Sequence, residues 1–166
     1  MGQLQFAIGS HERDNAMDRI TKEQRSELMS HIRSKDTKPE LLVRHHLHAL
    51  GFRYRLHSPK LPGHPDLVLT KWRTVIFVNG CFWHRHKNCK AATTPKSNVE
   101  FWQAKFARNV ARDRQEHAAL KAAGWRVIVL WECEVKRRLG ALADQIRQVR
   151  KTAGHATPGK RTRPAP

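Results

Sequence analysis

The sequence predicts a single α/β domain in which a mixed sheet carries helices on both faces. Its length of 166 residues suits one domain, and 39% of the residues are hydrophobic, on the low side for a globular protein. Short apolar segments and helical segments follow one another in the order α-β-β-β-α-β-α. We expect the domain over residues 18–150, a disordered, vector-derived N-terminus over residues 1–17 and a disordered basic tail over residues 151–166.

The domain is predicted to begin with two helices. Residues 17–33 mix charged and apolar positions, which indicates a short helix against DNA or the core. Pro39 suits the first turn of a second helix, because the backbone N–H that it lacks has no partner there. This helix runs over residues 40–50 with apolar residues at helical spacing, and Gly51 is placed to end it.

Three strands are predicted next. Residues 52–56 alternate between apolar and polar side chains, as a half-buried strand does. Turn residues at positions 61–65 precede two apolar runs, at 66–69 and 74–78, with residues 70–73 between them. This pattern predicts an antiparallel hairpin with buried faces.

The second half of the domain is predicted to hold a helix, a strand and a helix. The long helix covers residues 100–123, and Gly124 marks its end. Residues 125–131 are continuously apolar at their centre and predict a buried strand. A basic amphipathic helix then closes the domain, with apolar positions at Leu139, Leu142, Ile146 and Val149.

The net charge of +18 predicts a polyanionic partner, most commonly nucleic acid. A solubility surface or a ribosome-like assembly protein is the alternative. No apolar run approaches the roughly 20 residues that cross a bilayer, so no membrane partner is expected. Three cysteines cannot all pair in disulfides, which favours a reducing cytosol.

The cysteines predict a metal site. The segment from Cys81 to Cys89, here called the cysteine loop, contains two of them, and Cys133 is the third. Three thiols and one imidazole, from His84 or His86, complete a tetrahedral structural zinc site. Three buried free cysteines are the alternative, but the loop is too polar for a core.

Carboxylates predict a second metal site. Asp66 stands at the entrance of a predicted strand, and Glu40 lies on the helix before it. Oxygen ligands of this kind hold Mg²⁺, which can polarise a phosphodiester. Alternatively, Asp66 is an ordinary turn residue and Glu40 is a charge on the surface of its helix. His84, if it does not bind zinc, could remove a proton from water beside the ion.

Aromatic residues in basic segments predict contacts with bases. Phe82 and Trp83 have polar neighbours, so that stacking on bases or wedging between them is favoured. Trp102 is a third candidate for such contacts. Because it begins the apolar face of the long helix, it could instead be a buried core residue.

At these residues the chain resembles the very short patch repair (Vsr) DNA mismatch endonuclease family. The likeness extends from about Asp18 to Ile146. Five segments carry it: Leu61–Asp66, Val75–His84, Glu100–Trp102, Asn109–Asp113 and Gly124–Cys133.

The resemblance implies a restriction-endonuclease-like core of the PD-(D/E)xK type that nicks DNA with the help of Mg²⁺. Cleavage is expected 5′ to the thymine of a T:G mismatch that arises when 5-methylcytosine is deaminated. Asp66 and the backbone carbonyl of Val78 would bind Mg²⁺, His84 would be the general base and Glu40 would assist.

The resemblance also assigns the remaining candidate residues. Phe82, Trp83 and Trp102 would intercalate beside the mismatch. Double-stranded DNA with a T:G mismatch is the expected partner, together with a MutL-type mediator, for a monomer acting at the bacterial nucleoid in the cytoplasm. The structural zinc ligands would be Cys81, His86, Cys89 and Cys133.

The chain departs from the family pattern at two places. Asn79 stands where the pattern has a second catalytic histidine, and an asparagine can orient water or a phosphate but cannot act as a base. The interval between His86 and Cys89 is one residue longer. Two other functions are therefore considered: a catalytically silent, zinc-stapled DNA-binding module, and a nuclease of the same fold with different or relaxed specificity.

Overall fold

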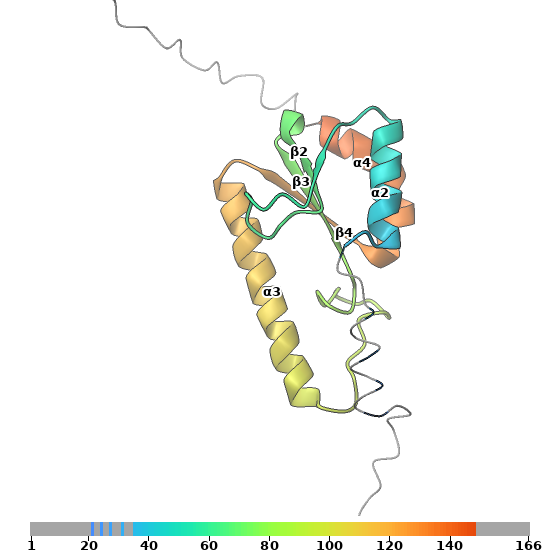
Figure 1. Cartoon of the computed structure of the whole chain (residues 1–166), viewed down its shortest axis with the longest axis vertical. Helices are drawn as coiled ribbons and strands as arrows, with labels where there is room; N and C mark the ends of the chain where they lie inside the picture. The colour runs from blue at the N-terminus through green and yellow to red at the C-terminus, as the bar shows by residue number, and fades with distance from the viewer. Residues whose placement is uncertain (1–20, 22–23, 25–26, 28–30, 32–34, 149–166) are drawn as a thin grey trace, which may run out of the picture.

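The computed structural model describes residues 35–148 and the single positions 21, 24, 27 and 31 (Figure 1). The helix expected over residues 17–33 lies largely outside these described residues, and the expected disordered ends lie wholly outside them. The predicted domain limits at residues 18 and 150 therefore stay predictions.

Four strands form one mixed sheet in the order β1-β2-β3-β4. β1 (Arg55–Leu56) and β2 (Leu67–Leu69) are antiparallel, as are β2 and β3 (Thr74–Asn79). β4 (Arg126–Trp131) pairs in parallel with β3 along its whole length. The predicted hairpin is thus confirmed, with the 3₁₀ turn Thr70–Trp72 as its connection.

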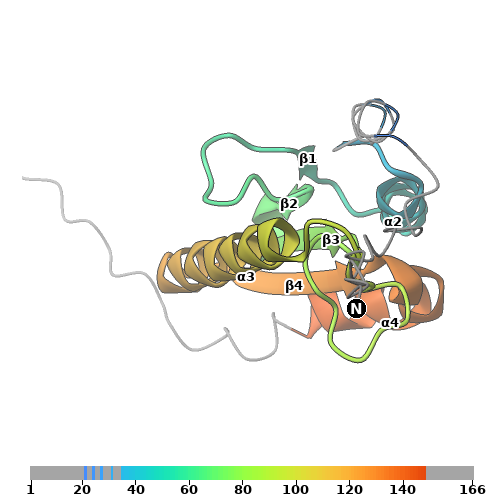
Figure 2. The same ribbon diagram turned by 90° about the horizontal axis from the view of Figure 1, so that it is seen from below.

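Helices cover both faces of this sheet. Helix α3 (Val99–Ala122) lies on one face, and α2 (Lys38–Ala49) and α4 (Val135–Arg147) lie on the other (Figures 1 and 2). The expected architecture, a mixed sheet flanked by helices, is confirmed. Among the described residues, no helix is both long and apolar enough to cross a membrane.

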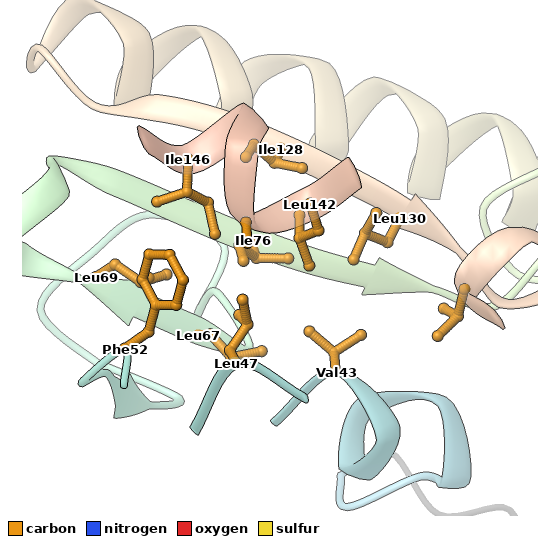
Figure 3. Packing of buried hydrophobic residues seen from close by; sticks show 12 residues of the cluster. Val43, Leu47, Phe52, Leu67, Leu69, Ile76, Ile128, Leu130, Leu142 and Ile146 are labelled. Carbon is orange, nitrogen blue, oxygen red and sulfur yellow. The ribbon is translucent and has the colours of Figure 1, made fainter. Parts of the chain in front are cut away.

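The core follows the two-residue period of the strands. Side chains at alternate positions of β2, β3 and β4 meet α2 and α4 in the larger cluster, which Figure 3 shows. The intervening positions meet Leu120 of α3 in a smaller cluster. Full burial of one such aliphatic side chain contributes about 1.5–3 kcal/mol. The larger cluster includes Leu47, Leu67, Leu69, Ile76, Ile128, Leu130, Leu142 and Ile146.

Local sequence explains where α2 begins and ends. The Thr37 hydroxyl oxygen accepts a hydrogen bond from the Glu40 backbone N–H at 3.5 Å, and Pro39 occupies the first turn. Gly51 takes a φ of +81° immediately after the helix, a conformation that favours glycine. The roles predicted for Pro39 and Gly51 are confirmed.

The predicted strand over residues 52–56 is wrong in extent. Only Arg55 and Leu56 pair with β2, and both are exposed. β2 ends at Leu69, after which the chain turns, so Phe52 and Arg53 have no strand opposite them in this register. Phe52 is still buried in the core, but it does not pair with a neighbouring strand.

Candidate active site and metal cluster

A cleft of 850 Å³ lies at the carboxyl end of β3, and it gathers residues that are far apart in the sequence. All four predicted catalytic residues line it: Glu40, Asp66, Asn79 and His84. The lining residues that matter below are Lys35, Glu40, His57, His64, Asp66, Val78, Asn79, Trp83, His84 and Glu132.

Asp66 lies at the entrance of β2 and is held against β3. Its Oδ2 accepts a hydrogen bond of 2.7 Å from the Val78 backbone N–H. Burial raises the pKa of Asp66 to about 6, the nearby Glu40 carboxylate adds to the rise, and the Val78 hydrogen bond opposes it. The pairing of β2 with β3 therefore brings Asp66 and Val78 together.

Glu40 is almost fully buried, with 2% of its surface exposed. Its Oε1 accepts a hydrogen bond from the Thr37 hydroxyl at 2.8 Å. Its Oε2 accepts from the Asp36 backbone N–H at 3.0 Å and from the Arg44 guanidinium at 2.8 Å. Both oxygens are thus engaged by α2 and by the two residues that precede it, although Glu40 also lines the cleft.

His84 is paired with a carboxylate of α3. Its Nδ1 lies 2.6 Å from Oδ2 of Asp113, and because a carboxylate only accepts, this nitrogen carries the proton. The neighbouring Asn109 donates a hydrogen bond from Nδ2 to the Trp83 carbonyl oxygen at 3.1 Å. One face of α3 therefore orients both the histidine and its loop.

Asn79 is the last residue of β3, is buried and lines the same cleft. The parallel partner strand β4 fixes its position, because Asn79 pairs with Trp131.

Phe82 and Trp83 join an aromatic cluster with residues of α3. Phe82 packs edge-on against Trp83 at 5.0 Å, Trp102 at 5.5 Å and Phe106 at 5.1 Å between ring centroids. Phe82 and Trp83 are partly exposed, whereas Trp102 is only 5% exposed. Phe101, on the same turn, is exposed.

The cysteine loop folds so that four potential ligands meet. The Sγ atoms of Cys81, Cys89 and Cys133 and a ring nitrogen of His86 all lie within 4.8 Å of one another. Individual separations are 3.7 Å between the sulfurs of Cys89 and Cys133, and 3.3 and 3.6 Å from His86 Nδ1 to Cys133 and Cys81. This cluster could hold a metal ion.

The donor set and its spacing fit a tetrahedral zinc site. Zinc–sulfur bonds of about 2.3 Å place neighbouring sulfurs about 3.8 Å apart in a tetrahedron. The His86 ring stacks on Trp131 at 4.3 Å with an 8° angle between their planes, which fixes the direction of its nitrogen. His86 thus joins the cysteines, while His84 faces the cleft with Asp113.

Sequence reasoning does not identify several residues of the site. Lys35, His57, His64 and Glu132 line the cleft, and Asp113 pairs with His84. Asp113, His64 and Glu132 fall within segments that carry the family resemblance, which is the one signal that could have singled them out. Lys35 and His57 lie outside these segments and reach the cleft only through tertiary folding.

Comparisons with known proteins assign the class. The profile described as DNA mismatch endonuclease Vsr matches residues 17–91. The type II nicking enzyme V.XorIIP of Xanthomonas oryzae pv. oryzae is 48% identical over 132 residues, which cover 80% of this chain and 96% of that protein. The DNA mismatch endonuclease Vsr of Escherichia coli K12 is 40% identical over 114 residues, 69% of this chain and 72% of that protein.

Among solved structures, the catalytic domain of the homing endonuclease I-Bth0305I is similar to this chain. It matches with a TM-score of 0.46 and 21% identity, over 70% of this chain and 97% of that domain.

The protein is a DNA endonuclease, the class to which these relatives belong. More narrowly, the chain belongs to the Vsr DNA mismatch endonuclease family, as its sequence resemblance indicates.

Proposed function

We propose that this protein is a Mg²⁺-dependent endonuclease that nicks one DNA strand 5′ to the thymine of a T:G mismatch and thereby begins very short patch repair. The observation that carries the proposal is the joint location of Asp66, Asn79, Trp83 and His84 along one cleft. The name of the Escherichia coli relative, a mismatch endonuclease, supports the choice of substrate.

Asp66 and the backbone carbonyl of Val78 would hold the catalytic Mg²⁺. A buried carboxylate beside a strand end that opens into a cleft is a suitable oxygen donor. When bound, the ion would polarise the phosphodiester and acidify an attacking water. The Val78 N–H keeps Asp66 Oδ2 in place for this role.

His84 is the proposed general base. Asp113 holds its protonated Nδ1, so Nε2 is free of a proton and can accept one from water. The Asp113 carboxylate then stabilises the imidazolium that forms, as in other carboxylate–histidine pairs. Asn79 would orient the water or the phosphate, and Glu40 would assist by orienting the residues around Asp66.

Aromatic side chains would recognise the weakened base step. Unstacking a step costs a few kcal/mol and least at a mispair, so insertion of Phe82 and Trp83 favours the mismatch. Trp102 is the third proposed ring. It is covered by its neighbours in this conformation, so its contact with bases requires the aromatic cluster to open.

Zinc is the metal that we propose for the cysteine cluster, with Cys81, His86, Cys89 and Cys133 as ligands. This site would fix the loop that carries Phe82, Trp83 and His84. Relatives in Escherichia coli and Xanthomonas oryzae support a bacterial DNA substrate at the nucleoid. A MutL-type mediator and monomeric action remain predictions.

The test uses end-labelled duplexes that differ only in a T:G or a T:A pair. With Mg²⁺, the wild-type protein should nick only the thymine strand of the mismatched duplex. Asp66→Ala should abolish nicking but leave binding largely intact, because it removes a metal ligand and no DNA-contacting ring.

Other results would favour the other functions. No cleavage of either duplex indicates a silent binding module, and equal cleavage indicates a nuclease of different specificity. Full nicking by Asp66→Ala would exclude Asp66 as the catalytic metal ligand.

A further inference from the structure

Arg44 is a buried cation beside the cleft, and three acceptors converge on it. Its guanidinium donates to Glu40 Oε2 at 2.8 Å, to His57 Nε2 at 2.9 Å and to Asp36 Oδ1. Arg44 is 7% exposed, and its Nε has no partner among the described residues. The position of the guanidinium is therefore set by these three acceptors through its terminal nitrogens.

The same three acceptors have the composition of a metal site. Ligand atoms of Asp36, Glu40 and His57 lie within 4.8 Å of one another. Two carboxylates and an imidazole are ligands that divalent cations accept. In this structure the guanidinium contacts all three, so the cation between them is supplied by the protein itself.

We propose that Arg44 is a built-in cation that fills a second metal site next to Asp66 and positions the catalytic carboxylate through His57. The inference rests on the proposed function, in which Asp66 binds the catalytic ion. Arg44 touches neither substrate nor that ion, and it is a positioning residue.

The direction of the hydrogen bonds links Arg44 to Asp66. A guanidinium can only donate, so His57 Nε2 accepts and the proton of the neutral ring is on Nδ1. His57 Nδ1 lies 3.8 Å from Asp66 Oδ1. At this distance, longer than a hydrogen bond, His57 acts on one oxygen of Asp66 electrostatically, while the Val78 N–H binds the other oxygen.

Charge explains why the position of Arg44 matters. The Glu40 side chain is 3% exposed and acts electrostatically on Asp66. Without Arg44, the Glu40 charge is buried and uncompensated beside a second carboxylate, which is strongly unfavourable. A divalent cation can relieve this repulsion by binding to the three released ligands.

The experiment counts Mn²⁺ ions bound to the zinc-loaded protein, by the electron paramagnetic resonance signal of the free ion. Arg44→Ala should bind one more Mn²⁺ per chain than the wild type, and the additional Asp36→Asn substitution should remove that ion. Arg138→Ala is the matched control, because it deletes a guanidinium that bonds to the Val129 carbonyl on β4, and its Mn²⁺ count should equal that of the wild type.

Activity gives an independent readout. In the presence of Mg²⁺, Arg44→Ala should nick about 10- to 100-fold more slowly, the usual effect of losing a residue that orients a metal ligand. Added guanidinium ion should restore part of the rate, whereas the same concentration of sodium ion should not. A merely structural role for Arg44 would give no such rescue.

A folded Arg44→Ala variant with an unchanged Mn²⁺ count would overturn the inference, whatever its rate. If circular dichroism shows that this variant does not fold, Arg44→Gln serves for the same count. Failure of the wild type to nick T:G duplexes would instead refute the proposed function, and the Mn²⁺ count would still test the role of Arg44.

Discussion

At the scale of single residues, the burial of Asp66, the proposed metal ligand, lowers the stability of the folded protein at neutral pH. Its pKa in the folded protein is about 6, above the ordinary 3.8, because burial disfavours the charged form. The folded state therefore binds more protons than the unfolded state between these two values. Above pH 6 the ionised carboxylate lowers the free energy of unfolding, and this cost disappears as the pH falls below 3.8.

Asp66→Asn should therefore stabilise the protein at neutral pH while abolishing nicking. We expect a gain in the free energy of unfolding on the order of 2 kcal/mol near pH 7.5, and almost none near about pH 4. Urea unfolding without added Mg²⁺ measures both values. Asp144→Asn, at a carboxylate with 73% of its side chain exposed, should change neither, and an equal gain at both pH values would contradict the burial argument.

Residue types and spacing predict only some of these residues. Asp66, His84 and the cysteines could be singled out because carboxylates, imidazoles and thiols have chemistry that is visible in the sequence. The partners Asp113, Arg44 and His57 could not, because an ordinary charged residue on a helix or loop gains its role only from what it faces after folding.

At the scale of elements, the cysteine loop depends on a ligand from the end of β4. Cys133 follows that strand, and its sulfur lies 3.7 Å from Cys89 in the loop. The loop itself has turns but no helix or strand between Cys81 and Cys89. Backbone hydrogen bonds in these turns and aromatic contacts with α3 shape the loop, and the proposed zinc ion would fix it further.

Cys133→Ser should release the loop without unfolding the sheet. Zinc content should fall from about one ion per chain to near zero, and nicking should be lost, because His84 and the rings are no longer held. The far-UV spectrum should remain, since the larger core cluster contains no member of the metal cluster. Atomic absorption and the duplex assay measure the two effects, and undiminished nicking by zinc-free protein would refute the role of the cluster.

The boundaries of the helices are predicted more accurately from the sequence than those of the first strand. Helices α2 and α3 lie within one or two residues of their predicted limits, since proline, glycine and apolar spacing mark them. β1 is much shorter than expected, because alternation reports burial and not the presence of a neighbouring strand.

At the scale of the whole molecule, we expect the net charge of +18 to govern the affinity for any DNA. Under the proposed function, Phe82 and Trp83 would govern the preference for mismatched over matched DNA. If the protein contacts about 6–10 phosphates, binding to matched duplex should weaken about 10³- to 10⁵-fold between roughly 50 and 200 mM salt. Lys87→Ala, at an exposed position of the cysteine loop, should lower the slope of log affinity against log salt by about one.

Trp83→Ala should leave that slope unchanged and reduce the preference for T:G over T:A duplex, because a ring carries no charge. Fluorescence anisotropy over a salt series measures both quantities. If Trp83→Ala lowers the slope as much as Lys87→Ala does, the proposal that charge sets affinity and the rings set mismatch preference is wrong.

The position of Cys133 in the chain also has a consequence during synthesis. A ribosome makes the cysteine loop well before it makes β4 and the last ligand of the cluster, 44 residues beyond Cys89. A nascent or truncated chain that stops before Arg126 has neither the parallel partner of β3 nor a complete ligand set. Such a fragment lacks both the strand and the ligand that complete the proposed site, so we expect the capacity to cut DNA to arise only after β4 and Cys133 have been synthesised.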